Sequence, residues 1–147
     1  MNSLMFMTDS EYQFNCKDFE LSYNIIEIDL SLVTDEQTYL DYIGELFSFP
    51  IFPGQKGHSW NGYFDWMRDL SWIFDSEISH NKTGVFLVFR NYGELINQPN
   101  GDDLYKKIID SYVYTILPWW AYEVENCVVG GCRRNFVICI IYNEDAS

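Results

Sequence analysis

Three short apolar runs divide the chain and predict the strands of a sheet. They are YNIIEIDL (23–30), VFLVF (85–89) and FVICIIY (136–142), which are rich in β-branched and aromatic residues. Short apolar runs with few or no polar breaks are typical of strands that are buried on both faces. The last run is the most apolar, and we expect it in the middle of the sheet.

The segments between these runs carry helical patterns. A capping box at 34–37 begins a helix over about 35–47. Ser59 caps a second helix over about 60–72, and a third is predicted over 102–117, where the next residue is a helix-ending proline. The apolar residues expected to face the sheet are Tyr39, Leu40, Ile43, Leu46 and Phe47 in the first helix, Trp60, Tyr63, Phe64, Met67 and Leu70 in the second, and Leu104, Ile108, Ile109, Tyr112, Val113 and Ile116 in the third.

Strands that alternate with helices predict a parallel sheet joined by right-handed crossovers, which is an α/β fold. The 147 residues are expected to form a single domain. Residues 1–22 show no sustained period and are interpreted as an extension that either adds an edge strand or packs on the surface. The segment 118–135 is interpreted as an insertion before the last strand.

The charge balance narrows the choice of partners. Nine Lys and Arg against 22 Asp and Glu give a net charge of −13. Nucleic acid phosphates and anionic membranes would be repelled, so a basic protein is the expected partner. The alternative is that acidity keeps an aromatic-rich chain soluble. No signal peptide and no run of about 20 apolar residues is found, so the protein is expected in the cytoplasm, away from membranes.

Residues that could hold a ligand give no convincing site. The segment GQKGHS (54–59) follows a helix and lacks the spacing of a phosphate loop. Cys127 and Cys132 lack a second ligand pair for zinc. Cys139 lies inside an apolar run and is expected to be a small core residue. We therefore expect no metal, no cofactor and no small-molecule substrate.

The most aromatic stretch, 49–73, is the candidate functional region. Asp65 and Asp69 lie one turn apart on the second predicted helix, with Arg68 between them. They allow three interpretations: acid and base catalysts acting with His58, a solvated helix face, or the acidic centre of a protein-binding surface. In the third interpretation, the acidic centre is surrounded by His58, Trp72, Phe49 and Phe52. The residues on this polar arc are Asn61, Asp65, Arg68, Asp69 and Trp72.

The order of motifs in this stretch resembles the barstar family, intracellular inhibitors of secreted ribonucleases. The motifs are a Phe-Pro pair, a glycine-containing loop, WNGYFD (60–65) and RDLSWI (68–73). The resemblance implies a three-stranded parallel sheet covered by helices, with the loop and the motif helix plugging a basic ribonuclease active site. Asp65 would then take the place of a substrate phosphate. The other contacts that the resemblance implies are Asn61, Gly62, Phe64, Gly57, Phe52 and an acidic contact at Asp110.

The match is incomplete. Ser59, Asn61 and Trp66 stand where the family usually has Asn, Asp and Cys, and the loop is two or three residues longer. The leading hypothesis is an immunity protein that blocks a cognate ribonuclease toxin, such as a contact-dependent or otherwise delivered one. The alternatives are an acidic regulatory module for a non-nuclease protein and a small hydrolase that uses Asp65, Asp69 and His58.

Overall fold

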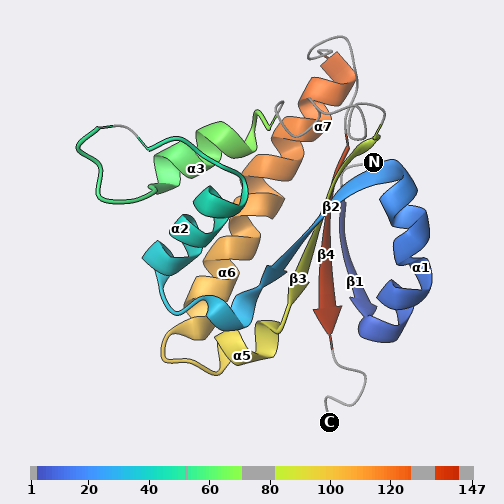
Figure 1. Cartoon of the computed structure of the whole chain (residues 1–147), viewed down its shortest axis with the longest axis horizontal. Helices are drawn as coiled ribbons and strands as arrows, with labels where there is room; N and C mark the ends of the chain where they lie inside the picture. Colours follow the sequence, from blue (N-terminus) through green and yellow to red (C-terminus); the bar gives the residue numbers. More distant parts are fainter. Residues whose placement is uncertain (1–2, 52, 71–81, 127–134, 143–147) are drawn as a thin grey trace.

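A four-stranded parallel sheet lies at the centre of the computed structural model (Figure 1). In spatial order, the strands are β1 (Ser3–Thr8), β4 (Asn135–Tyr142), β3 (Gly84–Arg90) and β2 (Tyr23–Asp29). The structure describes residues 3–51, 53–70, 82–126 and 135–142. The three predicted strands and their parallel pairing are confirmed.

The central strands are buried and the edge strands are not. Every residue of β3 except Arg90 is buried, as are Phe136 to Ile141 of β4, which confirms a central position for the last run. The expectation that β2 is equally buried is wrong. It pairs only with β3, for example Ile26 with Leu87, and most of its residues are half-buried.

The predicted three-stranded sheet is corrected to four strands because residues 1–22 add an edge strand, which is one of the two roles expected for this extension. Met5 of β1 pairs with Cys139 of β4, and α1 (Asp9–Ser22) follows β1 directly. Thr8 caps α1, and the Glu11 carboxylate accepts a hydrogen bond from the Thr8 N–H in return. The sequence pattern did not predict this helix. Phe14 on α1 is 87% exposed, so the apolar residues of α1 do not form one continuous face.

The first predicted helix is α2 (Glu36–Leu46), which begins one residue later than expected. Its cap is Asp35, whose carboxylate accepts from the Thr38 N–H at 2.8 Å, while the Thr38 hydroxyl accepts from the Asp35 N–H at 2.8 Å. A carboxylate one residue later displaces Thr34 as the cap. Leu46, which was assigned to the inner face, lies at the helix end and is exposed.

The third predicted helix is longer than expected and does not end at its proline. It consists of α6 (Gly101–Ser111), a π turn (Tyr112–Ile116) and α7 (Leu117–Asn126). Pro118 is the second residue of α7 and comes just after the π turn, where the regular α-helical hydrogen-bond pattern is already interrupted, so the helix continues past it. The insertion predicted over 118–135 is therefore partly helical, and its residues 127–134 lie outside the described residues. The short helix α5 (Tyr92–Ile96) was not predicted.

The helices form a layer on each face of the sheet (Figure 1). One face carries α2, α3 (Trp60–Met67), α6 and α7, which enclose the larger apolar core. The other face carries α1 over a smaller core that includes Cys139, as predicted for that cysteine. Among the described residues, no helix is both long enough and apolar enough to span a bilayer.

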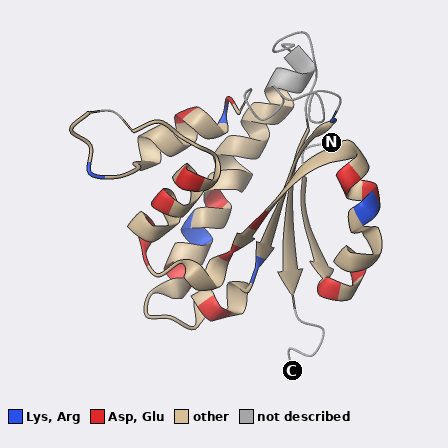
Figure 2. Cartoon of the chain, in the orientation of Figure 1, with Lys and Arg blue, Asp and Glu red and all other residues tan. Residues whose placement is uncertain are grey.

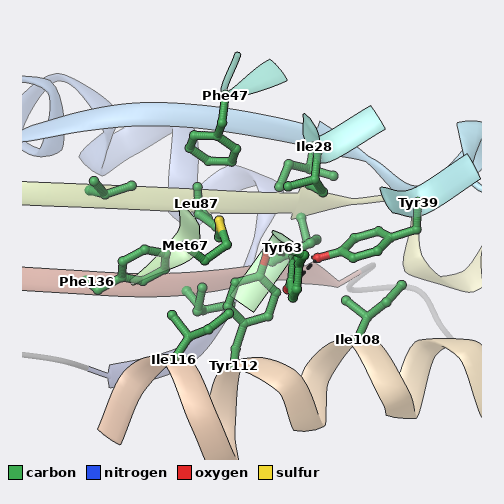
Figure 3. Packing of buried hydrophobic residues seen from close by; sticks show 14 of the residues in the cluster. Ile28, Tyr39, Phe47, Tyr63, Met67, Leu87, Ile108, Tyr112, Ile116 and Phe136 are labelled. Atoms are coloured by element: carbon green, nitrogen blue, oxygen red, sulfur yellow. Dashed lines mark hydrogen bonds between the residues drawn. The ribbon is translucent and has the colours of Figure 1, made fainter. Parts of the chain in front are cut away.

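A chain of buried hydroxyl groups runs through the larger core (Figure 3). Tyr39 Oη lies 2.9 Å from both Tyr63 Oη and Tyr112 Oη, and Tyr63 Oη lies 2.8 Å from Ser111 Oγ. Ser111 donates to the Ile108 carbonyl at 2.5 Å. Because each hydroxyl has one proton, Tyr63 must donate to Ser111, Tyr39 to Tyr63, and Tyr112 to Tyr39. The chain links α2, α3 and the π turn.

We expect this chain to make the protein sensitive to alkali. Burial raises the pKa of Tyr63 to about 12 and holds the pKa values of Tyr39 and Tyr112 well above their ordinary value. In the unfolded chain these tyrosines titrate near pH 10. The unfolded state therefore loses protons first, so the free energy of unfolding should fall as the pH rises above about 10.

Tyrosinate absorbance and circular dichroism, followed together during an alkaline titration, check this expectation. Ionisation of the three buried tyrosines should coincide with loss of secondary structure. Tyr39→Phe should make the alkaline loss of stability less steep. Complete tyrosine ionisation near pH 10 with the helical signal intact would show that these hydroxyls are not sealed in the core.

Candidate functional site

The motif helix α3 is shorter than its predicted counterpart. Its first turn is capped by Ser59, whose Oγ accepts from the Gly62 N–H at 3.1 Å, as predicted. The helix ends at Met67 instead of continuing to residue 72. Leu70 has a left-handed backbone (φ +52°) and donates its N–H to the Trp66 carbonyl at 3.2 Å, a geometry that terminates helices. Trp72 and Phe52 lie outside the described residues.

The inner side of α3 is only partly as predicted. Tyr63, Met67 and Leu70 are buried, but Trp60 and Phe64 are half-buried at the edge of the core. Trp60 and Phe64 lie one turn apart on the side of α3 at the edge of the core, where both stay partly exposed.

The amino-terminal end of α3 is held by a cluster of three elements. The Trp60 indole N–H donates to the Glu36 carboxylate of α2 at 2.9 Å. The Lys107 ammonium of α6 pairs with Glu36 and lies 4.9 Å from the centre of the Trp60 ring. The hydrogen bonds from Lys107 and Trp60 hold the pKa of Glu36 below its ordinary value. This cluster fixes the start of α3 on both neighbouring helices.

The carboxy-terminal end of α3 is held from α7. The Trp120 indole N–H donates to the Met67 carbonyl at 2.9 Å, and the Trp120 ring packs against Phe136 of β4 with centroids 5.3 Å apart. Helix ends leave carbonyl groups without intrahelical partners, so this bond satisfies one of them inside the core. The sequence offered no signal for this contact, because the residues after Pro118 showed no pattern.

The loop before α3 is fastened to α2 at His58. The His58 N–H donates to Asp41 at 3.0 Å, and the Gln37 amide donates to the His58 carbonyl at 2.9 Å. The His58 ring packs so closely on Gly44 that an added Cβ there would lie 2.4 Å from ring atoms. An added Cβ at Gly57 would lie 2.8 Å from the Gln37 amide nitrogen and 3.0 Å from an Asp41 carboxylate oxygen. Gly57 and His58 therefore hold the loop against α2 in the free protein, and their contact with a partner stays a prediction.

The outer face of α3 carries the predicted acidic centre. The Asp65 side chain is 70% exposed, and its carboxylate pairs with Arg68 at 3.0 Å. Arg68 also donates from Nε to the Phe64 carbonyl at 3.0 Å, which anchors the guanidinium at the helix end. Asn61 and Asp69 are exposed as well, whereas Asp110 is half-buried on α6.

The surroundings of this face are acidic. Helix α2 carries Glu36, Asp41 and Glu45 and has no basic residue. Figure 2 shows these carboxylates on the helix next to α3. In the described part of the chain, no group of three or more His, Cys, Asp or Glu residues could hold a metal ion.

The fold and this surface define a class: a parallel α/β protein that presents one short helix, held at both ends, to solvent. A family model described as "Barstar (barnase inhibitor)" matches residues 23–113, which is more than half of the chain. The chain therefore belongs to the barstar family, as the resemblance predicted. Neither the curated proteins nor the solved structures yielded a match.

Membership in this family indicates a protein-binding function of the barnase-inhibitor kind. Members of the family are inhibitors and not enzymes. The matched segment begins at β2 and includes α2, α3 and α6, so the Asp65 face lies within it. Strands β1 and β4 and helices α1 and α7 lie outside it.

Proposed function

We propose that this protein is an immunity protein that binds one cognate basic ribonuclease toxin and blocks its active site. The observation that carries the proposal is the Asp65 carboxylate, exposed on a helix whose two ends are fastened to the core. A carboxylate held in this way can meet a cationic active site without a large loss of conformational entropy on binding.

Electrostatics favour the same partner. The net charge of −13 and the carboxylates of α2 beside α3 would attract a cationic protein over a distance and raise the association rate. Fast association matters for an inhibitor that must act before RNA is cut. The contact residues that we assign to this surface are Asn61, Gly62, Phe64, Asp65, Arg68 and Asp69, with Asp110 beside them and with Phe52 and Trp72 outside the described part.

The partner differs from that of a minimal family member. The loop before α3 is two or three residues longer than in the usual family pattern, and β1 and α1 precede the matched segment while α7 and β4 follow it. We propose that the partner is a toxin domain delivered by a competing cell, for example in a contact-dependent manner. The proposed site of action is the cytoplasm, where such a toxin would meet RNA.

Gly62→Ala should separate folding from binding. An added Cβ at Gly62 would have Ser59 Oγ as its nearest neighbour, at an ordinary contact distance of 3.4 Å. The fold therefore does not require this glycine, and alanine in a helix is favoured by up to about 1 kcal/mol. The same methyl group would obstruct a close-fitting partner at a cost of about 1–3 kcal/mol. The free energy of unfolding, measured with denaturant, should therefore rise, while the affinity for the nuclease, measured by calorimetry, should fall.

Gly93→Ala is the matched control for this test. Gly93 also lies in a helix, α5, and an added Cβ there meets no atom within 4 Å. This variant should change the stability without changing the affinity. Equal affinities for Gly62→Ala and the unsubstituted protein would show that the first turn of α3 is not part of the interface.

A titration of RNA cleavage tests the function itself. The nuclease would be the product of the reading frame adjacent to the gene for this chain, with purified barnase as a second probe. We expect cleavage by the neighbouring nuclease to stop at one equivalent of this protein. Unchanged cleavage by both nucleases in the presence of excess protein would contradict the proposal.

A further inference from the structure

The loop between α2 and α3 starts and ends on α2. At its start, Ser48 has a left-handed backbone (φ +59°), and the Phe49 N–H donates to the Gly44 carbonyl at 2.8 Å, which is a Schellman-type helix end. The buried Phe49 ring stacks on Phe47 with centroids 5.7 Å apart. At the other end of the loop, the His58 ring lies 6.4 Å from the Phe49 ring. Both ends of the loop are therefore fixed close together.

The residues between these two ends face solvent. We call residues 50–57 the projecting loop. All of its described residues from 50 to 56 are exposed, including Ile51 at 48%. Figure 1 shows the loop projecting beyond the amino-terminal end of α3. Because Ser59 caps α3, the loop leads directly into the helix that carries Asp65, and the two form one continuous surface. Compact loops with closed ends are frequently functional.

The projecting loop carries a charge of the opposite sign to its surroundings. Lys56 is the only Lys or Arg between Glu36 and Met67. The acidic residues of the same segment are Glu36, Asp41, Glu45 and Asp65. A single positive charge therefore lies beside a surface that is otherwise negative.

The positive charge of Lys56 is not neutralised within the described part of the molecule. The two other basic side chains that contact α3 have carboxylate partners, since Arg68 pairs with Asp65 and Lys107 pairs with Glu36. Lys56 forms no ion pair with any residue that the structure describes. Its ammonium group is therefore available to a carboxylate on another protein.

We propose that Lys56 determines which ribonuclease is bound, by pairing with a carboxylate that the cognate nuclease carries beside its basic active site. This inference rests on the proposed function. The acidic surface of α2 and α3 attracts any basic nuclease, so it does not distinguish one from another. A fixed positive charge at the edge of that surface repels a nuclease that is basic there as well, and like charges brought together suppress wrong partners.

Lys56→Glu tests the proposal through the sign of its effect. The substitution makes the protein more negative by two charges, so long-range attraction alone would strengthen binding to a basic nuclease. A pairing between Lys56 and a carboxylate has the opposite consequence. We expect the affinity for the neighbouring nuclease to fall by about tenfold to a hundredfold, mainly through faster dissociation, measured by surface plasmon resonance.

Two variants serve as controls. Lys17→Glu makes the same change in net charge at an exposed position of α1, on the opposite face of the sheet from α3. It should associate slightly faster and dissociate at an unchanged rate. Lys56→Arg keeps the charge and should retain most of the affinity. Circular dichroism verifies that each variant is folded, which we expect because both lysines are exposed.

Barnase is the second nuclease in this test, because specificity requires a comparison. Lys56→Glu should bind barnase no more weakly than the unsubstituted protein does. An equal loss of affinity for both nucleases would show that Lys56 does not distinguish between them, and it would overturn the inference.

Failure of this inference and failure of the proposed function give different results. If the unsubstituted protein binds the neighbouring nuclease and Lys56→Glu binds it as tightly as Lys17→Glu does, Lys56 meets no carboxylate and the proposed function stands. If the unsubstituted protein binds neither nuclease, the proposed function fails and the inference about Lys56 fails with it.

Discussion

Replacing Asp65 with alanine is expected to weaken binding to the partner ribonuclease by several kcal/mol while leaving the fold nearly unchanged. Truncating one member of a buried, hydrogen-bonded charge pair in an interface has a cost of this size, and the barnase–barstar pair is the reference case. In the free protein, the Asp65–Arg68 pair is largely exposed. Exposed pairs contribute about 0–1 kcal/mol to folding. Calorimetry measures the affinity for the ribonuclease, and denaturant unfolding measures the stability of the fold.

Asp18→Ala is the control for charge alone. Asp18 is exposed on α1, across the sheet from α3, and its removal changes the net charge by the same amount. It should lower the association rate slightly and leave the dissociation rate unchanged. If Asp65→Ala changed the association and dissociation rates no more than Asp18→Ala does, Asp65 would contribute only to the long-range electrostatic attraction and not to the interface.

Replacing Trp120 with alanine is expected to destabilise the protein by about 3–5 kcal/mol, the usual cost of truncating a buried tryptophan. The substitution would remove the packing against Phe136 and would leave the Met67 carbonyl without its indole partner. Because that bond holds the end of α3, binding should weaken as well. Denaturant unfolding followed by circular dichroism gives the stability change.

Two further variants separate the loss of the indole hydrogen bond from the loss of ring packing. Trp120→Phe keeps a ring but loses the donor, and it should cost about 1–3 kcal/mol. Trp119→Ala, at the half-buried neighbouring position, should cost less than Trp120→Ala. A change below about 1 kcal/mol for Trp120→Ala would show that α7 does not support α3.

The sequence predicted the strands best where burial is complete. β3 and β4 are central strands, so every position is apolar except Arg90 and Asn135 at their ends, and the apolar runs are easily recognised. β1 was missed because an edge strand of six residues has no comparable signal, and because α1 exposes Phe14 on the side that a periodic pattern would keep polar. Propensity and period are weak guides where burial is partial.

The sequence predicted the motif of the candidate site but not the contacts that hold α3 in place. Ser59 and Asp65 could be read from local rules, capping and polar spacing. Lys107 and Trp120 contact α3 from 47 and 53 residues away in sequence, and no local pattern encodes such contacts. The helix beyond Pro118 was missed because the π turn breaks the 3.6-residue period immediately before it.

Competition with an active-site ligand tests the central claim most directly. The neighbouring nuclease would be saturated with a DNA oligonucleotide that occupies its active site without being cleaved, and binding of this protein would be titrated by calorimetry. If Asp65 and its helix occupy that active site, the apparent affinity should fall in proportion to the oligonucleotide concentration, with no ternary complex. A ternary complex with undiminished affinity would contradict the account.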